Sequence, residues 1–432
     1  RILALVMLVS IAQVAVADVG NTNPNDLVGI FEYNQDIGSP EGIGFTMDMG
    51  IGITPGLGDS REYLLTGSGA DVWGNWDEFH MAYNLVSGDV RVTSDFDWVA
   101  ARNGWAKYGV MLRGSDAGDA VHFSTLTRKA EDLIRQGRRF DIGGGSSDAG
   151  FNMDTSNTTM SVQRITSGGI TVIQSLIDRN EGAGWEVVAT NVNPNLPDEI
   201  LAGVFITSHD DTGLAQVKAY NVKYESENID LIGVTTVDGT IDQCSDIPGF
   251  KLRTKKRDLA QTEWGYNEAI KLLNGDYVGD VLDWDLLGQP GFSPLEATRV
   301  DPIVNLNQDD SDIGAFGDDS HFPGIDLVKE KGVFPDDNDD DNDFAVEVIA
   351  CIYLTEGLHI IGANGDDGTI VEIGGVEIGR AAEWKGSSNV DFLFDVAAEG
   401  FYSFKATHLG GGGGENLELH EVMADGTRIL LG

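Results

Sequence analysis

The sequence predicts an all-β protein made of two β-sandwich domains of jelly-roll type, joined by a partly helical connector. Three observations favour this class. Short segments that alternate apolar and polar residues recur along most of the chain, as half-buried strands do. Glycine is frequent, at 56 residues of 432, and it separates these segments without a collagen-like period. The length, with 41% hydrophobic residues, indicates two or more domains with real cores.

The first predicted domain covers residues 18–228 and consists of regularly spaced short strands. Breaks of hairpin type, such as Ser87-Gly88-Asp89, separate several of them. Strands at this spacing are typical of a β-sandwich. Examples of the expected strands are residues 61–66, 79–85, 89–96, 108–113, 120–126, 160–165, 170–176 and 217–224.

Residues 229–300 change in character, and we interpret them as a connector. A basic run, K-L-R-T-K-K-R, occupies residues 251–257, and we expect it to pair with the acidic bulk of the chain. Residues 259–275 have the pattern of an amphipathic helix, with Gly275 as its end. The helix residues expected in the core are Leu259, Trp264, Ile270 and Leu273.

The second predicted domain covers residues 301–432 and is again rich in strand patterns. An acidic run at 336–343 interrupts it, and a glycine tract at 410–414 predicts a flexible loop. The acidic run lacks the glycine that the sharp turn of an EF-hand needs, so we interpret it as a solvated insertion. The expected strands are residues 301–306, 344–354, 359–364, 369–373, 391–396, 401–407, 416–422 and 428–431.

The charge balance is strongly acidic, with 70 Asp and Glu against 28 Lys and Arg and a formal net charge of -42. Binding of nucleic acid needs basic surface to neutralise phosphates, so a nucleic-acid partner is not expected. An acidic surface favours solubility and attracts cations, as in proteins of a salty or extracellular setting.

The first 17 residues indicate an exported protein. Arg1 precedes an apolar stretch that ends in Ala15-Val16-Ala17, which is the pattern of a secretory signal peptide cleaved before Asp18. A membrane anchor is the alternative, but the stretch is short for a span and ends in small residues. We therefore expect a secreted or cell-envelope protein, and we expect the natural chain to start upstream because Arg1 stands in place of Met.

Two cysteines, Cys244 and Cys351, leave two alternatives open. Export permits a disulfide between them. Cys351 also lies in a predicted strand, where a buried free thiol is equally compatible with the pattern. The spacing of cysteines and histidines matches no zinc site.

The N-terminal domain resembles the bacterial concanavalin-like lectin/glucanase jelly rolls over residues 26–226. The resemblance rests on G-S-G-A-D-V-W-G (67–74), on K-Y-G-V-M-L-R (107–113), and on the segments 203–210 and 217–222. In that family such elements mostly build the sandwich. The resemblance therefore implies structural roles for Asp71, Trp73, Asp77 and Arg113, with Arg113 paired to a carboxylate. The residues expected to stack on sugar rings are Trp76, Trp98 and Trp105.

Catalysis is not expected from this domain. Laminarinase-type relatives carry an E-x-D-x-x-E strand that supplies the two carboxylates of glycoside hydrolysis, and the sequence has no such run. It also has no G-x-S-x-G elbow, P-loop or H-E-x-x-H motif. A glycoside hydrolase remains an alternative.

The stretch G-A-N-G-D-D-G-T-I-V-E-I-G-G (362–375) places Asp366 beside Asp367 at the end of an apolar run. With its flanking strands it resembles the protective-antigen-type (PA14) sugar-binding domain over residues 301–432. In sugar-binding members of that family the paired aspartates coordinate calcium, which accepts sugar hydroxyls. The resemblance thus implies that Asp366 and Asp367 are calcium ligands, joined by an Asn from another loop, either Asn389 or Asn416.

Physical chemistry agrees with that use, because calcium takes six to eight oxygen ligands and its charge removes the repulsion between adjacent carboxylates. The alternative is that Asp-Asp-Gly only shapes a turn. Our first hypothesis is an exported, lectin-like, non-catalytic carbohydrate-binding protein with a calcium-dependent glycan site. The second is a structural or adhesive cell-surface protein that binds protein partners, and the third is a glycoside hydrolase. The sequence leaves the glycan and the oligomeric state open.

Overall fold

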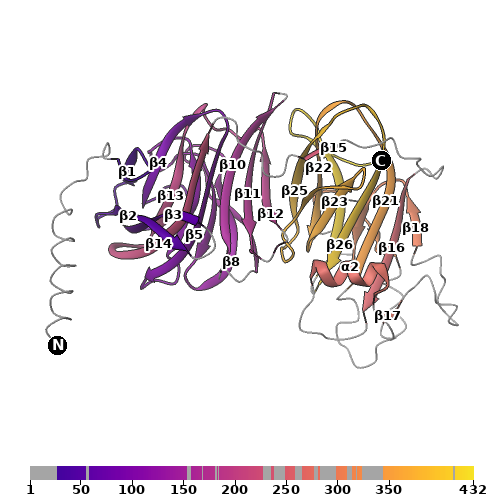
Figure 1. The fold of residues 1–432 in the computed structure, drawn as a ribbon, viewed down its shortest axis with the longest axis horizontal. Coiled ribbons are helices and arrows are strands. Elements are labelled where there is room, and N and C mark those ends of the chain that lie inside the picture. The colour runs from indigo at the N-terminus through magenta and orange to yellow at the C-terminus, as the bar shows by residue number, and fades with distance from the viewer. Residues whose placement is uncertain are drawn as a thin grey trace.

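The computed structural model describes residues 27–54, 58–152, 157–167, 169–180, 182, 184–226, 235–237, 249–257, 265–276, 281–282, 298–308, 314–317, 319–323, 344–411 and 414–432. These residues form an all-β molecule of two lobes that lie side by side, with strands β1 to β14 in one lobe and β15 to β28 in the other (Figure 1). The expected fold class is therefore confirmed. The predicted signal peptide, the acidic run at 336–343 and Cys244 lie outside the described residues.

The N-terminal lobe is a sandwich of two seven-stranded sheets whose described strand pairs are all antiparallel. One sheet runs, in spatial order, β1 (Tyr33–Ile37), β4 (Phe79–Ser87), β13 (Glu199–Thr207), β6 (Lys107–Arg113), β7 (His122–Arg128), β8 (Glu131–Arg139) and β9 (Ser147–Asn152). The other runs β12 (Trp185–Val192), β11 (Ile170–Asp178), β10 (Thr159–Ser167), β5 (Val90–Ala100), β14 (Asp210–Ser226), β3 (Gly58–Gly69) and β2 (Phe45–Thr54).

Alternating apolar residues of both sheets meet in the core of this lobe. Val110 and Val204 come from the first sheet and Val92 and Val162 from the second, and all four are fully buried in one cluster. Burial of such side chains from both inner faces is what holds a sandwich together. The expected strands therefore lie where their period-two pattern places them.

The expected structural pair of Arg113 with a carboxylate is confirmed and is part of a larger network. Arg113 Nη1 donates to Asp77 Oδ2 at 2.7 Å, and both side chains are fully buried. Arg139 also donates to both oxygens of Asp77, at 2.7 Å. A buried carboxylate that accepts from two guanidiniums is a structural tie, because each buried charge needs a partner.

The C-terminal lobe is a second sandwich. One sheet has the order β15 (Thr235–Val237), β25 (Ser388–Val396), β22 (Gly357–Asp366), β27 (Asn416–Val422), β19 (Asn305–Asn307) and β20 (Ser320–His321), with β28 (Arg428–Leu430) paired to β27. The other has the order β17 (Val281–Leu282), β16 (Phe250–Arg257), β21 (Phe344–Leu354), β26 (Gly400–Gly410), β23 (Thr369–Ile373) and β24 (Val376–Arg380), with β18 (Thr298–Asp301) paired to β16.

The segment expected as a connector contributes strands to this second sandwich. Strand β16 is the basic run itself, and it pairs with β21 from Lys251–Ile349 to Lys256–Phe344. Leu252 and Thr254 face inward and are fully buried, and the intervening Arg253 forms an ion pair with Glu347 at 2.8 Å. The expectation that the basic run pairs with acidic residues is thus met at Arg253. The interpretation of this segment as a connector was wrong, because its basic residues hid the period-two pattern of a strand.

The predicted helix is present in the same segment. Helix α2 spans Tyr266–Asn274 and ends at Gly275, whose φ of 78° is in the left-handed region. Leu273 is buried as expected, whereas Ile270 is 37% exposed and was wrongly placed in the core. Leu259 and Trp264 lie outside the described residues. The strand expected at 301–306 is split into β18 and β19, because Pro302 has no amide N–H for the ladder.

The two sandwiches pack directly against each other. Gln174 Nε2 donates to the carbonyl of Asp391 at 3.0 Å, and Ala382 N donates to the carbonyl of Val187 at 3.1 Å. Arg179 of the N-terminal sandwich pairs with Glu383 of the C-terminal sandwich at 2.6 Å. Strands β11 and β12 and the turn between them therefore contact the second sandwich.

The structure also bears on the state of Cys351 and on the expected absence of a membrane-spanning helix. Cys351 is disulfide-bonded, so the free-thiol alternative was wrong; the only other cysteine of the sequence, Cys244, lies outside the described residues. Among the described residues, no helix has the length and apolar character that a membrane crossing requires.

Candidate metal centre

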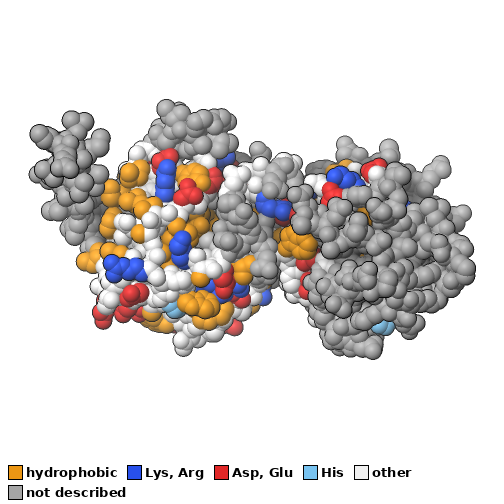
Figure 2. All heavy atoms as spheres, turned by 90° about the horizontal axis from the view of Figure 1, so that it is seen from below, with side chains coloured by type: hydrophobic (Ala, Val, Ile, Leu, Met, Phe, Trp, Pro, Cys, Tyr) orange, Lys and Arg blue, Asp and Glu red, His pale blue; other side chains and the backbone are white. Residues whose placement is uncertain are grey.

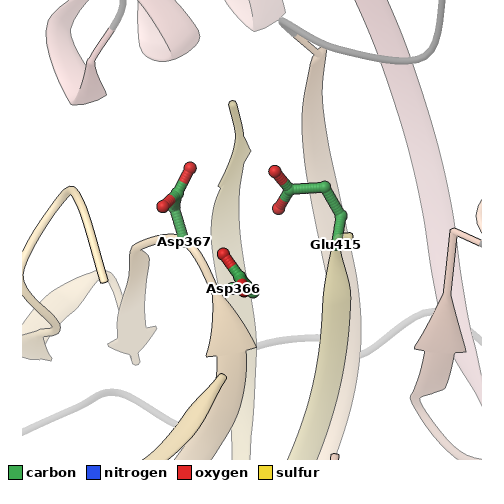
Figure 3. A group of neighbouring side chains, drawn as sticks. All are labelled: Asp366, Asp367 and Glu415. Atoms are coloured by element: carbon green, nitrogen blue, oxygen red, sulfur yellow. The ribbon is translucent and has the colours of Figure 1, made fainter. Parts of the chain in front are cut away.

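Three carboxylates meet where the chain passes from one sheet of the C-terminal sandwich to the other. Asp366 is the last residue of β22, and Asp367 follows it in the short turn that leads to β23. Glu415 directly precedes β27. Strands β22 and β27 pair so that Asp366 lies opposite Asn416, and this register brings Glu415 beside the two aspartates (Figure 3).

The geometry of the cluster is compact. One oxygen from each of Asp366, Asp367 and Glu415 lies within 4.8 Å of the others. Figure 3 shows Glu415 reaching across from its own strand toward the two aspartates. Asp367 and Glu415 are buried and Asp366 is half-buried. The peptide bond between the two aspartates is cis.

Each carboxylate is held on one side by a backbone amide. Asp366 Oδ2 accepts from Ser387 N at 3.2 Å, Asp367 Oδ1 accepts from Lys385 N at 3.2 Å, and Glu415 Oε1 accepts from Gly411 N at 2.8 Å. The second oxygens of Asp367 and Glu415 are buried and have no hydrogen-bond partner within the described part of the chain. Buried polar atoms normally have partners, so these two oxygens are the clearest sign of an ion site.

The electrostatics of the cluster are unfavourable to three free carboxylates. Burial, together with the charge of Asp366, raises the pKa of Asp367 to about 7. Burial, followed by the charges of Asp367 and Asp366, raises the pKa of Glu415 well above its usual range. Burial also raises the pKa of Asp366. A bound cation would reverse these shifts, because it removes the repulsion that keeps protons on the carboxyl groups.

Two other titratable groups border the cluster. Burial lowers the pKa of Lys385 to about 8, and its ammonium donates to the carbonyls of Gly365 and Ser388 rather than to a carboxylate. Burial lowers the pKa of His408 to about 3, so its ring is neutral, and His408 Nε2 lies 4.0 Å from Glu415 Oε2. The wall of the site therefore carries at most one positive charge against three carboxylates.

The donor set fits a hard divalent cation such as calcium. Three carboxylates offer up to six oxygens, and calcium takes roughly six to eight oxygen ligands with flexible geometry. The backbone at Gly411 also packs closely against the carboxylates. A Cβ at Gly411 would lie 2.5 Å from Asp367 Oδ2 and 2.5 Å from the ring of Trp384, so a side chain there would intrude on the carboxylate. The residues present thus fit a calcium site built by Asp366, Asp367 and Glu415.

The two asparagines predicted for the site lie beside the cluster and are joined through Asn364. Asn416 is fully buried and its amide donates to Asn364 Oδ1 at 2.9 Å, while its own Oδ1 has no partner within the described residues. Asn389 is half-buried and accepts from Asn364 Nδ2 at 3.0 Å. The carboxylate cluster itself contains neither asparagine, and its third member, Glu415, is the residue that sequence reasoning missed.

The predicted sugar-stacking tryptophans belong to the N-terminal sandwich. Trp76 and Trp105 are each 51% exposed, and Arg128 lies over the Trp105 ring at 4.9 Å. Trp98 is half-buried, with its ring centroid 4.7 Å from that of Tyr108. On the face of this sandwich in Figure 2, exposed hydrophobic side chains lie among both basic and acidic ones. Gly118 packs against the Trp76 ring, where an added Cβ would lie 2.5 Å from it, so Trp76 and Trp105 each offer at most one ring face for sugar contacts.

Comparisons with known proteins give similarities of fold at low identity. No protein-family model matches the sequence, and no curated protein matches it. The PA14 domain of the MpAFP antifreeze protein is 16% identical and covers 44% of this chain and 93% of its own, with a TM-score of 0.30. The carbohydrate-binding module CBM66 from Bacillus subtilis is 18% identical, with coverages of 38% and 95% and a TM-score of 0.26. The family 7 alginate lyase A1-II' is 13% identical, with coverages of 44% and 80% and a TM-score of 0.25.

Proposed function

We propose that this chain is an exported, non-catalytic carbohydrate-binding protein in which Asp366, Asp367 and Glu415 hold a calcium ion. The observation that carries the proposal is the set of three carboxylates within 4.8 Å, two of them with buried oxygens that lack a hydrogen-bond partner among the described residues. When bound, calcium supplies coordination positions for the hydroxyl groups of a saccharide.

The residues of the chain prepare this site in three ways. Backbone amides of Ser387, Lys385 and Gly411 fix the orientation of the carboxylates. Burial of Asp367 and Glu415 keeps competing water from their oxygens and strengthens their attraction for a cation. The half-buried Asp366 is the most accessible member, so a saccharide would approach the ion from its side.

The test is saccharide binding by the full-length chain on a glycan array, with calcium and with EDTA. The full chain is needed because β15 and β16, which precede residue 301, are strands of the C-terminal sandwich. We expect binding that requires calcium and is lost in the Asp366→Asn/Asp367→Asn double variant. The matched control is Glu356→Gln/Glu399→Gln, which removes two exposed carboxylates from the same sandwich.

Other outcomes decide between the remaining hypotheses. A chain that binds calcium but no saccharide, and that retains partners on a cell surface, would favour the adhesive hypothesis. Turnover of a polysaccharide that is lost when a single carboxylate is replaced would make the chain a glycoside hydrolase and would overturn the proposal.

A further inference from the structure

A polar cavity of about 580 Å³ lies between the two sandwiches, within the range of roughly 300–1,000 Å³ that is usual for ligand sites. Its N-terminal wall comes from β8, β9, β12 and the loop after β12, and its C-terminal wall from β22, the start of β25 and β28. Most of the lining side chains carry amide, hydroxyl or guanidinium groups rather than apolar ones. The residues that matter below are Arg138, Phe140, Asp141, Asn191, Asn389 and Arg428.

The N-terminal wall presents a guanidinium that lacks a carboxylate partner. Arg138 donates to Gln136 Oε1 and to Ser147 Oγ, both at 3.3 Å and both neutral. No carboxylate of the described residues lies within 4.0 Å of it, and Asp148, whose charge acts on it, is already paired with Arg128 and Arg135 at 2.8 and 2.9 Å. Such a group is unexpected in a chain of net charge -42.

The same guanidinium is held in a fixed place. Gln136 is fully buried and also accepts from Asn191 Nδ2 at 2.7 Å, so it anchors Arg138 from behind. The Arg138 guanidinium lies 5.2 Å from the centroid of the Phe140 ring, and Phe140 is 43% exposed. A positive group and an aromatic surface are therefore presented together at one side of the cavity.

The C-terminal wall adds a second guanidinium and free amide groups. Arg428 pairs with Asp391 at 2.5 Å and lines the same cavity as Arg138. Among the described residues of the cavity wall, Asp141 is the one carboxylate, and it is exposed. The amide nitrogen of Asn389 and the amide oxygen of Asn191 have no partner within the described residues, so they are available to a ligand.

The cavity also adjoins the candidate metal centre. Ser387 lines the cavity, its hydroxyl donates to Asn364 Oδ1 at 2.8 Å, and its backbone amide donates to Asp366 Oδ2 at 3.2 Å. One short segment thus forms part of both sites, and a chain-like ligand in the cavity would continue toward Asp366.

We propose that this cavity is a second saccharide site that takes an acidic sugar of the uronate class. The sugar carboxylate pairs with Arg138, its hydroxyls bond to the amides of Asn191 and Asn389, and its ring packs on Phe140. A guanidinium matches the two oxygens of a carboxylate, amide side chains match vicinal hydroxyls, and an aromatic face matches the apolar face of a pyranose. The inference depends on the proposed function only in taking a saccharide as the ligand.

The test is calorimetric titration of the full-length chain with uronate trisaccharides, namely trimers of galacturonate, glucuronate, mannuronate and guluronate. Each trimer is compared with its methyl ester, which keeps the rings but removes the negative charges. EDTA is present throughout, because uronates themselves bind calcium. The variants are Arg138→Gln, Arg138→Lys and Asn389→Asp, and the control is Lys218→Gln, which removes a positive charge from strand β14 of the N-terminal sandwich.

We expect at least one trimer to bind the wild type about tenfold or more tightly than its methyl ester, as loss of a charge-assisted pair predicts. Arg138→Gln should remove that preference, Arg138→Lys should keep part of it, and Asn389→Asp should weaken binding by repulsion. Lys218→Gln should bind like the wild type. Thermal melts of each variant show whether it is folded.

Three results would overturn the inference: no uronate binds, esters bind equally well, or folded Arg138→Gln binds like the wild type. Failure of the proposed calcium site would give a different result. Uronate would still bind in EDTA in a way that depends on Arg138, whereas calcium would act equally on the wild type and on the Asp366→Asn/Asp367→Asn variant.

Discussion

Replacement of Asp367 by Asn should stabilise the calcium-free protein at pH 8. Asp367 is buried beside Asp366, and its pKa rises from 3.8 to about 7. Because the folded-state pKa is above the unfolded one, the folded state binds the extra proton, and stability falls as the pH rises from about 4 to about 7. By the same relation, the raised pKa lowers the free energy of unfolding by about 2 kcal/mol at pH 5 and by about 4 kcal/mol at pH 8. Asn carries no charge, so the Asp367→Asn variant does not lose this stability.

The measurement is thermal unfolding of wild type and Asp367→Asn in EDTA at pH 5 and pH 8. Since about 1 kcal/mol shifts the Tm of a domain of this size by about 2–4 °C, we expect the variant to melt several degrees higher at pH 8 and the gap to shrink at pH 5. The difference between the Tm values of the two proteins removes the effect of groups that titrate in both. One such group is Glu186, whose pKa burial raises to about 7.

Calcium should close the gap in stability at pH 8. An ion at about 1,000 times its Kd stabilises the wild type by about 4.1 kcal/mol, which offsets the cost of about 4 kcal/mol, and the variant should gain little. The reasoning is refuted if Asp367→Asn melts below the wild type at pH 8 in EDTA, or if the gap between them does not change with pH.

Three further predictions follow from the packing. Gly411→Ala should weaken calcium binding about tenfold or more in a calorimetric titration, because its Cβ meets a ligand carboxylate, whereas Gly386→Ala, where a Cβ meets nothing within 4 Å, should not. Asp77→Asn should lower the free energy of unfolding in urea by about 3–5 kcal/mol, since two buried guanidiniums lose their charged partner; a loss below about 1 kcal/mol would contradict the network. Arg179→Ala should destabilise the protein more at pH 8 than at pH 5. Burial raises the pKa of its partner Glu186 to about 7, so Glu186 is charged at pH 8, where it needs Arg179, and is mostly protonated at pH 5. An equal loss of stability at both pH values would contradict this.

The sequence predicted the fold class because period-two patterns are local. Strands such as β6 and β21 lie where the alternation places them. Strand β16 escaped prediction because Lys and Arg alternate with its inward Leu252 and Thr254, and only pairing with β21, almost a hundred residues away, gives it a sheet to join. Sheet membership depends on such non-local partners, which a single sequence does not display.

The candidate site was predicted in part for the same reason. Asp366 and Asp367 are adjacent in the chain and visible as a motif. Glu415 follows a glycine tract and joins them only through the register of β22 with β27. The available signal was its place directly before a predicted strand. Arg139 was missed likewise, because its partner Asp77 is 62 residues away.

The most direct test of the central claim is calorimetric titration of calcium into the full-length chain at pH 7, in two buffers of different ionisation enthalpy. The account predicts one saturable site that vanishes in Asp366→Asn/Asp367→Asn. It also predicts proton release on binding, because the raised pKa of Asp367, about 7, leaves that carboxyl partly protonated beforehand. Equal, weak heats from wild type and variant would contradict the account and would mean that the two aspartates only shape a turn.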